Sequence, residues 1–229
     1  MKVINFLNII IRKITNHSKI LNKIIVNRFH HLYFDSFKTT LRNSFWLGVP
    51  IVKCPLDTWI FQEIIYSLKP DVIVECGTSR GGSSMYFASL CDLIDNGRII
   101  TIDIKKLDGV PQHKRIKCLV GSSISNEVID QVKNLISERD KVMVMLDSSH
   151  EKNHVLNELR IYSKMVTIGS YIIVEDTNVN GHPVLPNHGP GPMEAVEIFL
   201  KENKNFKVDK TREKFLMTFN PNGYLKRIK

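Results

Sequence analysis

Residues 72–84 constrain the fold more than any other stretch of this sequence. They read Val-Ile-Val-Glu-Cys-Gly-Thr-Ser-Arg-Gly-Gly-Ser-Ser. The β-branched start predicts a strand that is covered on both faces. Gly77, Gly81 and Gly82 permit a tight turn and the close approach of a ligand to the backbone. Ser83 and Ser84 can cap a following helix, so the stretch predicts a strand, a glycine-rich turn and a helix start.

The next predicted strand, residues 98–103, ends in Asp103. In nucleotide-binding folds an acid at this place binds the ribose hydroxyls. The turn reads Glu-x-Gly-x-x-x-Gly-Gly, which is neither the dinucleotide pattern nor a P-loop. An acid before the first glycine disfavours a pyrophosphate, so the pattern favours S-adenosylmethionine. A turn that only reverses the chain is the alternative.

Strands and helices alternate along the rest of the chain. Further strands are predicted over 116–120, 142–147 and 171–175, and helices near 55–68, 83–94, 124–137, 152–166 and 193–203. The apolar stripe expected for the first of these helices is Trp59, Ile60, Ile64 and Ile65. The alternation predicts an α/β fold with a mostly parallel, doubly wound sheet and helices on both faces. Strands over 206–209 and 215–228, with a turn at 220–223, predict a C-terminal antiparallel hairpin, as in Rossmann-like class I methyltransferases.

Two regions are expected, a helical extension over residues 1–40 and a methyltransferase domain over 41–229. Within residues 1–34, apolar residues at helical spacing, Leu21, Ile24 and Ile25 among them, predict one or two amphipathic helices with a basic polar face. Packing on the domain or on a dimer partner and binding at a membrane surface are the readings left open.

The net charge of +9 is concentrated at the two ends of the chain. Residues 1–35 carry +5 and residues 201–229 carry +6, whereas residues 36–200 carry −2. A nucleic-acid-binding protein usually carries its basic residues on the binding domain, so no nucleic-acid partner is expected. The basic N-terminal segment fits peripheral contact with an anionic membrane through residues 1–34.

The sequence predicts a cytoplasmic protein, with peripheral attachment to the inner membrane face as the further reading. It has no run of 18 apolar residues, and Arg12-Lys13 follows the apolar start where a signal peptide would have small residues. The four cysteines show no paired spacing and read as reduced thiols.

Three acids follow two of the later predicted strands. Asp147 ends one strand, and Glu175 and Asp176 end the other. Because ligands bind beyond the carboxyl ends of parallel strands, these carboxylates should converge near the cofactor. Three converging carboxylates repel one another, and a hard divalent cation such as Mg²⁺ would neutralise them. Separate loop acids that cap helices or face water are the alternative.

His150 lies three residues after Asp147 and is the predicted general base. Its ordinary pKa near neutrality suits proton transfer from a hydroxyl. A surface or capping role is the competing interpretation. His182 and His188 lie in the long loop 177–192 and are weaker candidates for the base.

With these residues placed, the chain resembles the bacterial family named for cephalosporin hydroxylase and rhamnosyl O-methyltransferase. The matching stretches are Trp46-x-Gly48, Lys53-x-Pro55-x-Asp57, Glu75-x-Gly77-x-x-x-Gly81-Gly82-Ser83, Thr101-x-Asp103, Gly121-Ser122-Ser123, Asp147-Ser148-Ser149-His150, Val174-Glu175-Asp176-Thr177 and Gly189-Pro190-Gly191-Pro192-x-Glu194-Ala195. The resemblance implies a class I methyltransferase that uses S-adenosylmethionine and Mg²⁺. It implies cofactor contacts from Glu75, Gly77, Ser79, Gly81, Asp103, Ser122 and Ser123, and metal ligation by Asp147, Glu175 and Asp176.

The expected activity is Mg²⁺-dependent methylation of a hydroxyl on a sugar or glycoside, with Asp147 and His150 as catalytic residues. The acceptor is expected to be a small molecule or a lipid-linked sugar, and self-association is plausible for the family. A hydroxylase, as the family name suggests, and a non-catalytic binding module are the competing functions. A hydroxylase would need iron, and the sequence offers no clear set of two histidines and one carboxylate to hold it.

Overall fold

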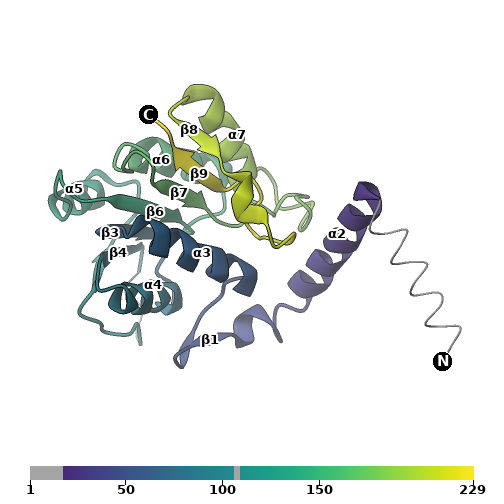
Figure 1. Ribbon diagram of the computed structural model, residues 1–229, viewed down its shortest axis with the longest axis horizontal. Helices are drawn as coiled ribbons and strands as arrows, with labels where there is room; N and C mark the ends of the chain where they lie inside the picture. The colour runs from purple at the N-terminus through teal and green to yellow at the C-terminus, as the bar shows by residue number, and fades with distance from the viewer. Residues whose placement is uncertain (1–17, 106–108) are drawn as a thin grey trace, which may run out of the picture.

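A seven-stranded sheet forms the centre of the molecule in the computed structural model, which describes residues 18–105 and 109–229 (Figure 1). The strand order is β5-β4-β3-β6-β7-β9-β8. The strands are β3 (Val72–Cys76), β4 (Arg98–Asp103), β5 (Ile116–Val120), β6 (Val142–Leu146), β7 (Tyr171–Val174), β8 (Phe206–Val208) and β9 (Tyr224–Arg227). Strands β3 to β7 are parallel, and β9 runs antiparallel to both of its neighbours. The predicted fold class is therefore confirmed.

Helices cover both faces of this sheet. On one face, α3 (Pro55–Leu68) and α4 (Gly82–Leu93) pack against apolar residues of β3, β4 and β6. On the other face, α5 (Asn126–Asn134), α6 (Lys152–Tyr162) and α7 (Pro192–Glu202) bury a second apolar cluster. Side chains alternate between the two faces along each strand, and both faces are covered, which explains why β3 and β6 are buried along their whole length.

The register of the central strands brings the predicted site residues to one edge of the sheet. Cys76 of β3 pairs with Ile102 of β4 and with Leu146 of β6. The backbone N–H of Gly77 donates to the carbonyl of Ile102, and that of Asp147 donates to the carbonyl of Cys76, both at 2.8 Å. The residues that follow β3, β4 and β6 therefore emerge side by side at the carboxyl edge.

Helix α2 (Lys19–Asp35) projects away from the sheet layers, at the right of Figure 1. It touches the domain through a face that contains Val26, His30, Tyr33 and Phe34. Ile24 and Ile25 of the expected apolar stripe are about half exposed, so this stripe does not pack on the domain. Docking is decided by aromatic packing on Phe219, whose ring stacks on the His30 ring at 5.1 Å. The expected helix in residues 1–17 lies outside the described residues.

The segment before β9 departs from the predicted strand over 215–228. It contains a 3₁₀ turn, Lys210–Glu213, and an irregular stretch, and the strand itself begins only at Tyr224. Residues 220–223 form a turn, with the Gly223 N–H donating to the Asn220 carbonyl at 2.9 Å, but this turn precedes β9 and does not join two paired strands.

The irregular stretch is held by the buried carboxylate of Asp57 on α3. It accepts hydrogen bonds from the Thr218 hydroxyl at 2.5 Å, the Phe219 N–H at 2.8 Å and the Tyr224 hydroxyl at 2.7 Å. The bond from Phe219 satisfies a backbone N–H that a strand would have paired, and the other two satisfy buried hydroxyls. A buried acid on a helix thus replaces the sheet ladder here.

One smaller expectation near the start of the domain also needs correction. Trp59 is 59% exposed and does not belong to the buried stripe of α3. Just before α3 the chain forms a short hairpin of β1 (Phe45–Trp46) and β2 (Val49–Pro50). The Trp46 indole N–H donates to the Ser89 hydroxyl at 3.1 Å and so ties this hairpin to α4. None of the helices in the described part of the chain is both long and apolar enough to cross a membrane.

Candidate active site

The glycine-rich turn after β3 is shaped by close contacts with its neighbours. Gly77 has a φ of +105°, and a Cβ atom there would overlap the backbone carbonyl of Asp147. The backbone N–H of Ser79 donates to the Asp103 carboxylate at 2.8 Å. Glycine is required at position 77 because β3 and β6 approach too closely there for any side chain.

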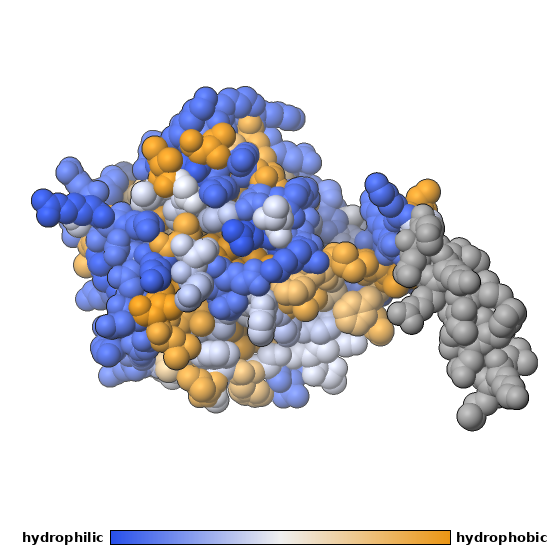
Figure 2. Space-filling model, in the orientation of Figure 1, coloured by the Kyte–Doolittle hydropathy of each residue, from blue (hydrophilic) through white to orange (hydrophobic). Residues whose placement is uncertain are grey.

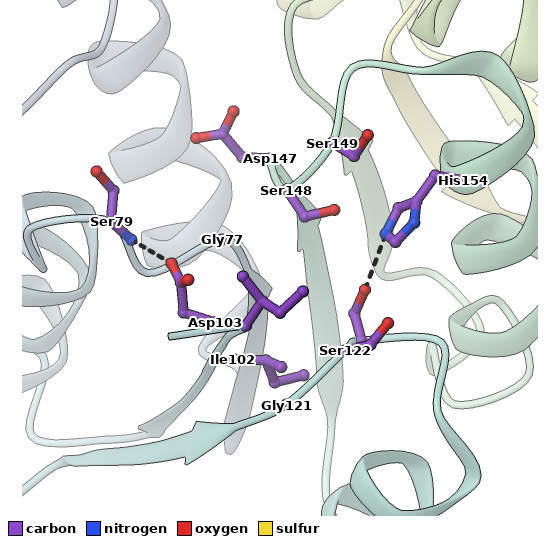
Figure 3. Close-up of a pocket in the computed structure, with 12 residues that line it drawn as sticks. Gly77, Ser79, Ile102, Asp103, Gly121, Ser122, Asp147, Ser148, Ser149 and His154 are labelled. Carbon is purple, nitrogen blue, oxygen red and sulfur yellow. Dashed lines mark hydrogen bonds between the residues drawn. The ribbon is translucent and has the colours of Figure 1, made fainter. Parts of the chain in front are cut away.

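A cavity of about 240 Å³ opens beside this turn (Figure 3). Its walls include Gly77, Ser79, Ile102, Asp103, Ser122, Ser123 and Asp147, so five of the seven predicted cofactor residues line one cavity. Asp103 lies on one side, and His154 of α6 lies on the other. The arrangement of an acid, an apolar wall and a polar far end suits a nucleoside.

The other two predicted cofactor residues, Glu75 below the turn and Gly81 at its end, do not line this cavity. Glu75 is buried, and its carboxylate accepts hydrogen bonds from the hydroxyls of Ser84 and of Thr101. Burial raises the pKa of Glu75, partly offset by these donors. Gly81 has a φ of +77° and forms the N-cap of α4. Both residues therefore act on the shape of the turn.

A cluster of three titratable groups lies at the carboxyl edge of the sheet, beyond the ends of β6 and β7. Asp147, His150 and Asp176 each offer one ligand atom, and these atoms lie within 4.8 Å of one another. His150 Nε2 lies 3.4 Å from Asp147 and 3.2 Å from Asp176. Burial lowers the pKa of His150, but the two carboxylates outweigh it and raise that pKa to about 9.

Lys53 also belongs to this candidate site, although the sequence analysis assigned it no role there. Its ammonium group is buried and forms ion pairs with Asp147 and, at 2.8 Å, with Glu175. Burial lowers the pKa of Lys53, but the two carboxylates raise it above its ordinary value overall. Lys53 therefore supplies part of the positive charge that the three acids were expected to obtain from a metal ion.

The remaining donor set fits a divalent cation. Asp147 and Asp176 provide carboxylate oxygens, as hard cations prefer, and His150 provides an imidazole nitrogen. Glu175 lies outside this group of three, yet its buried Oε1 has no hydrogen-bond partner among the described residues. An unpaired buried carboxylate oxygen is costly, which makes Glu175 Oε1 a further candidate ligand.

A second and larger cavity, of about 520 Å³, lies on the other side of the turn. Its walls carry Lys53, Asp147, His150 and Asp176, and also Phe37, Arg42 and Arg80. Both cavities share Gly77, Ser79, Asp147 and Ser148. Two ligands could thus meet at Asp147, next to the acidic cluster.

The two weaker candidate bases are placed differently from His150. His182 lies 3.0 Å from Glu194 and lines neither of these cavities. Glu194 also accepts from the Asn180 amide and the Gly191 N–H, and these contacts hold the loop against α7. His188 is exposed and its Nδ1 lies 3.2 Å from the carbonyl of Gly189. Of the three histidines, only His150 lies within the acidic cluster.

The sheet order, the antiparallel β9 and the glycine-rich turn facing Asp103 define a class I methyltransferase fold. A family model described as Rhamnosyl O-methyltransferase/CmcI matches residues 38–228, and the chain belongs to this family. The expected family resemblance is confirmed.

Curated relatives and solved structures agree with this assignment. A rhamnosyl O-methyltransferase of Mycobacterium tuberculosis is 37% identical over 210 residues, covering 88% of this chain and 84% of the relative. One from Mycobacterium leprae is 34% identical over 207 residues, covering 88% and 90%. A structure of CmcI with Mg-SAM superposes with a TM-score of 0.64 at 18% identity, covering 82% of this chain and 78% of that one, which supports the fold.

Proposed function

We propose that this protein transfers a methyl group from S-adenosylmethionine to a hydroxyl of a sugar or glycoside, with the help of a divalent cation, Mg²⁺ in the first instance. The observation that carries the proposal is the meeting of two cavities at Asp147, one suited to a nucleoside and one beside the acidic cluster. Membership of the family and the names of its rhamnosyl O-methyltransferase relatives support a sugar acceptor.

In this proposal the first cavity binds the cofactor. Asp103 would accept hydrogen bonds from the ribose hydroxyls, and the turn at Gly77 and Ser79 would face the methionine portion. Asp147 stands at the wall shared with the second cavity. A sulfonium methyl placed there would point toward an acceptor hydroxyl, and such positioning alone can contribute roughly 7–11 kcal/mol.

The acidic cluster would prepare the acceptor. A divalent cation, when bound, would favour the deprotonated form of a hydroxyl that it contacts. Asp147 and Asp176 would hold the cation with Glu175 as a third ligand. The cation would then offset the two carboxylates that raise the pKa of His150 to about 9, and the neutral His150, left outside the ligand set, would take the acceptor proton. Lys53 would keep Asp147 and Glu175 in place through its two ion pairs.

A hydroxylase is the second candidate function, and the donor set argues against it. Non-haem iron oxygenases use two histidines and one carboxylate. The cluster found within residues 18–105 and 109–229 has one histidine and two carboxylates. The preserved cluster likewise argues against a non-catalytic binding module.

The first test is calorimetric titration with S-adenosylmethionine, with and without Mg²⁺. We expect binding with a dissociation constant on the order of 10 μM or below. Tritium transfer from labelled cofactor to a panel of free, glycosidic and lipid-linked sugars then identifies the acceptor. An absence of cofactor binding in both conditions would refute the proposal.

Asp147→Asn tests the role of the acidic cluster. We expect methyl transfer at saturating Mg²⁺ to fall at least about 100-fold, because charge stabilisation by a catalytic metal is worth several kcal/mol. Asp130→Asn is the control, since Asp130 is an exposed residue of α5. Unchanged turnover in Asp147→Asn would show that the reaction does not pass through the cluster.

We also propose that the outer face of α2 makes a contact beyond this chain. Its large apolar side chains Ile20, Ile24, Ile25, Phe29 and Leu32 are exposed. Apolar surface, orange in Figure 2, gathers over the part of α2 nearest the domain. A membrane surface and a second copy of the chain are the two occupants that fit.

Ile24→Ser with Phe29→Ser removes apolar surface without adding charge and separates these two occupants. Loss of binding to anionic vesicles identifies a membrane surface, and a smaller mass in light scattering identifies self-association. If both measurements match the parent protein, the outer face of α2 has no such role.

A further inference from the structure

The far end of the cofactor cavity is built on a buried carboxylate. Glu158 of α6 is fully buried, and its Oε1 accepts hydrogen bonds from the hydroxyls of Ser123 at 2.5 Å and Ser148 at 2.6 Å. His154 Nε2 lies 3.3 Å from the same oxygen. These three partners of Glu158, Ser123, Ser148 and His154, all line the cavity.

This arrangement fixes the imidazole of His154. Its Nε2 faces both the Glu158 carboxylate and, at 3.1 Å, the hydroxyl of Ser123, a contact drawn in Figure 3. Its Nδ1 makes no hydrogen bond to any described residue. The hydrogen bond with Glu158 raises the pKa of His154. At a pH above that raised value the ring is neutral, and with its one proton on Nε2, toward Glu158, it keeps a lone pair on Nδ1 that can accept a hydrogen bond.

The imidazole of His154 lies at the end of the cavity where the adenine base of a bound cofactor would lie. Asp103 and His154 lie on opposite sides of the cavity in Figure 3, and Ile102, Ile104, Ser122 and Ser123 also line it. A ribose held by Asp103 would therefore direct its base along the apolar wall toward His154. Among the residues at that end, His154 carries a polar ring edge that is only partly exposed, with 24% of the side chain accessible. A buried charge is costly to maintain, so the network around Glu158 needs an explanation beyond packing.

We propose that His154 recognises the adenine base of the cofactor by accepting a hydrogen bond from its 6-amino group. Glu158 is the positioning residue that holds the imidazole in the orientation needed for this hydrogen bond. The inference rests on the proposed binding of S-adenosylmethionine. It gives His154 and Glu158, which belong to none of the sequence motifs described above, a role in selecting adenine over other bases.

The test is calorimetry at pH 8.5 with two ligands, S-adenosylhomocysteine and S-inosylhomocysteine, in which the 6-amino group is replaced by a carbonyl. The parent protein is expected to prefer the adenosyl ligand by about tenfold or more. His154→Ala and His154→Phe should lose about tenfold in affinity for the adenosyl ligand and no more than about twofold for the inosyl ligand. His113→Ala is the matched control, because His113 also pairs with a carboxylate, Asp92, but lies outside this cavity.

Glu158→Gln keeps the size of the side chain and tests positioning. It should reduce the preference between the two ligands to about threefold or less while the protein still unfolds cooperatively. An equal loss of affinity for both ligands in the His154 variants would show that His154 does not accept a hydrogen bond from the 6-amino group. An unchanged preference in Glu158→Gln would overturn the positioning role, and a parent protein that binds neither ligand would refute the proposed function itself.

Discussion

At the scale of single residues, Gly77 allows the glycine-rich turn to pack directly against Asp147, the residue that follows β6. A Cβ atom at this position would overlap the carbonyl of Asp147, and its φ of +105° is unfavourable for other residues. Gly77→Ala should therefore lower the unfolding midpoint and abolish cofactor binding, with a stability loss of about 3 kcal/mol or more.

Gly169→Ala is the matched control for that prediction. Gly169 has a φ of +86°, but nothing lies within 4 Å of the added atom. It should lose only about 1 kcal/mol, from backbone strain. Equal melting curves for the two variants would show that the contact with Asp147 is unimportant.

Lys53 offers a second prediction at this scale. Lys53→Met leaves the carboxylates of Asp147 and Glu175 without their buried counter-charge, so the free energy of unfolding should fall by about 3 kcal/mol or more. Removing a neighbouring cation should also increase the affinity of the cluster for Mn²⁺, which electron paramagnetic resonance titration measures directly. Weaker Mn²⁺ binding in a folded Lys53→Met protein would contradict this account.

The sequence predicted much of the site at this scale, but only where residues follow strands. Asp103 and Asp147 were found because the ends of parallel strands converge. Lys53 precedes a helix and pairs with Asp147, 94 positions later in the sequence. His154 and Glu158 lie four residues apart on α6, but both contact Ser123, which is 31 and 35 positions away. Their roles depend on tertiary contacts that no local pattern contains.

At the scale of elements, α2 depends on one buried histidine. The ring of His30 stacks on Phe219, and its Nε2 lies 2.9 Å from the Asn178 amide. Burial, with a smaller contribution from His31, lowers the pKa of His30 from 6.5 to about 4. The unfolded chain therefore binds more protons between these pH values, and stability falls as the pH drops from 6.5 toward 4.

His30→Gln should reduce that pH dependence. We expect the melting temperature to fall less between pH 7.5 and pH 5 in this variant than in the parent protein or in His31→Gln. Hydrogen exchange of the α2 amides locates the effect. An identical fall in all three proteins would mean that His30 does not control the docking of α2.

The elements themselves were well predicted where apolar periodicity was strong. β3, β5 and α3 begin and end as expected. The segment before β9 was not, because Thr218 and Phe219 satisfy their hydrogen bonds on Asp57 of a distant helix. The spacing of Ile24 and Ile25 predicted an apolar stripe on α2, but it could not tell what this stripe contacts. In the structure the two residues lie on the outer face of α2 and do not pack on the domain.

At the scale of the whole molecule, the site is divided into two cavities that share only the region of Gly77 and Asp147. Removal of divalent cations with a chelator should therefore abolish methyl transfer, yet change the affinity for S-adenosylhomocysteine by no more than about twofold. Asp103→Asn should instead lower the affinity for S-adenosylhomocysteine, because this carboxylate is proposed to bind the ribose hydroxyls. Calorimetry with and without chelator, set beside initial rates, checks both expectations, and a chelator that abolished cofactor binding would contradict them.

The contacts of Asp57 have a consequence for how a newly made chain matures. Its carboxylate joins residues that lie 161 to 167 positions later in the sequence. Such distant contacts form late, because closing a long loop costs entropy before any contact offsets that cost. Until then the segment from 214 to 223 has no partner, and we expect it to be the region that chaperones and proteases encounter during biosynthesis.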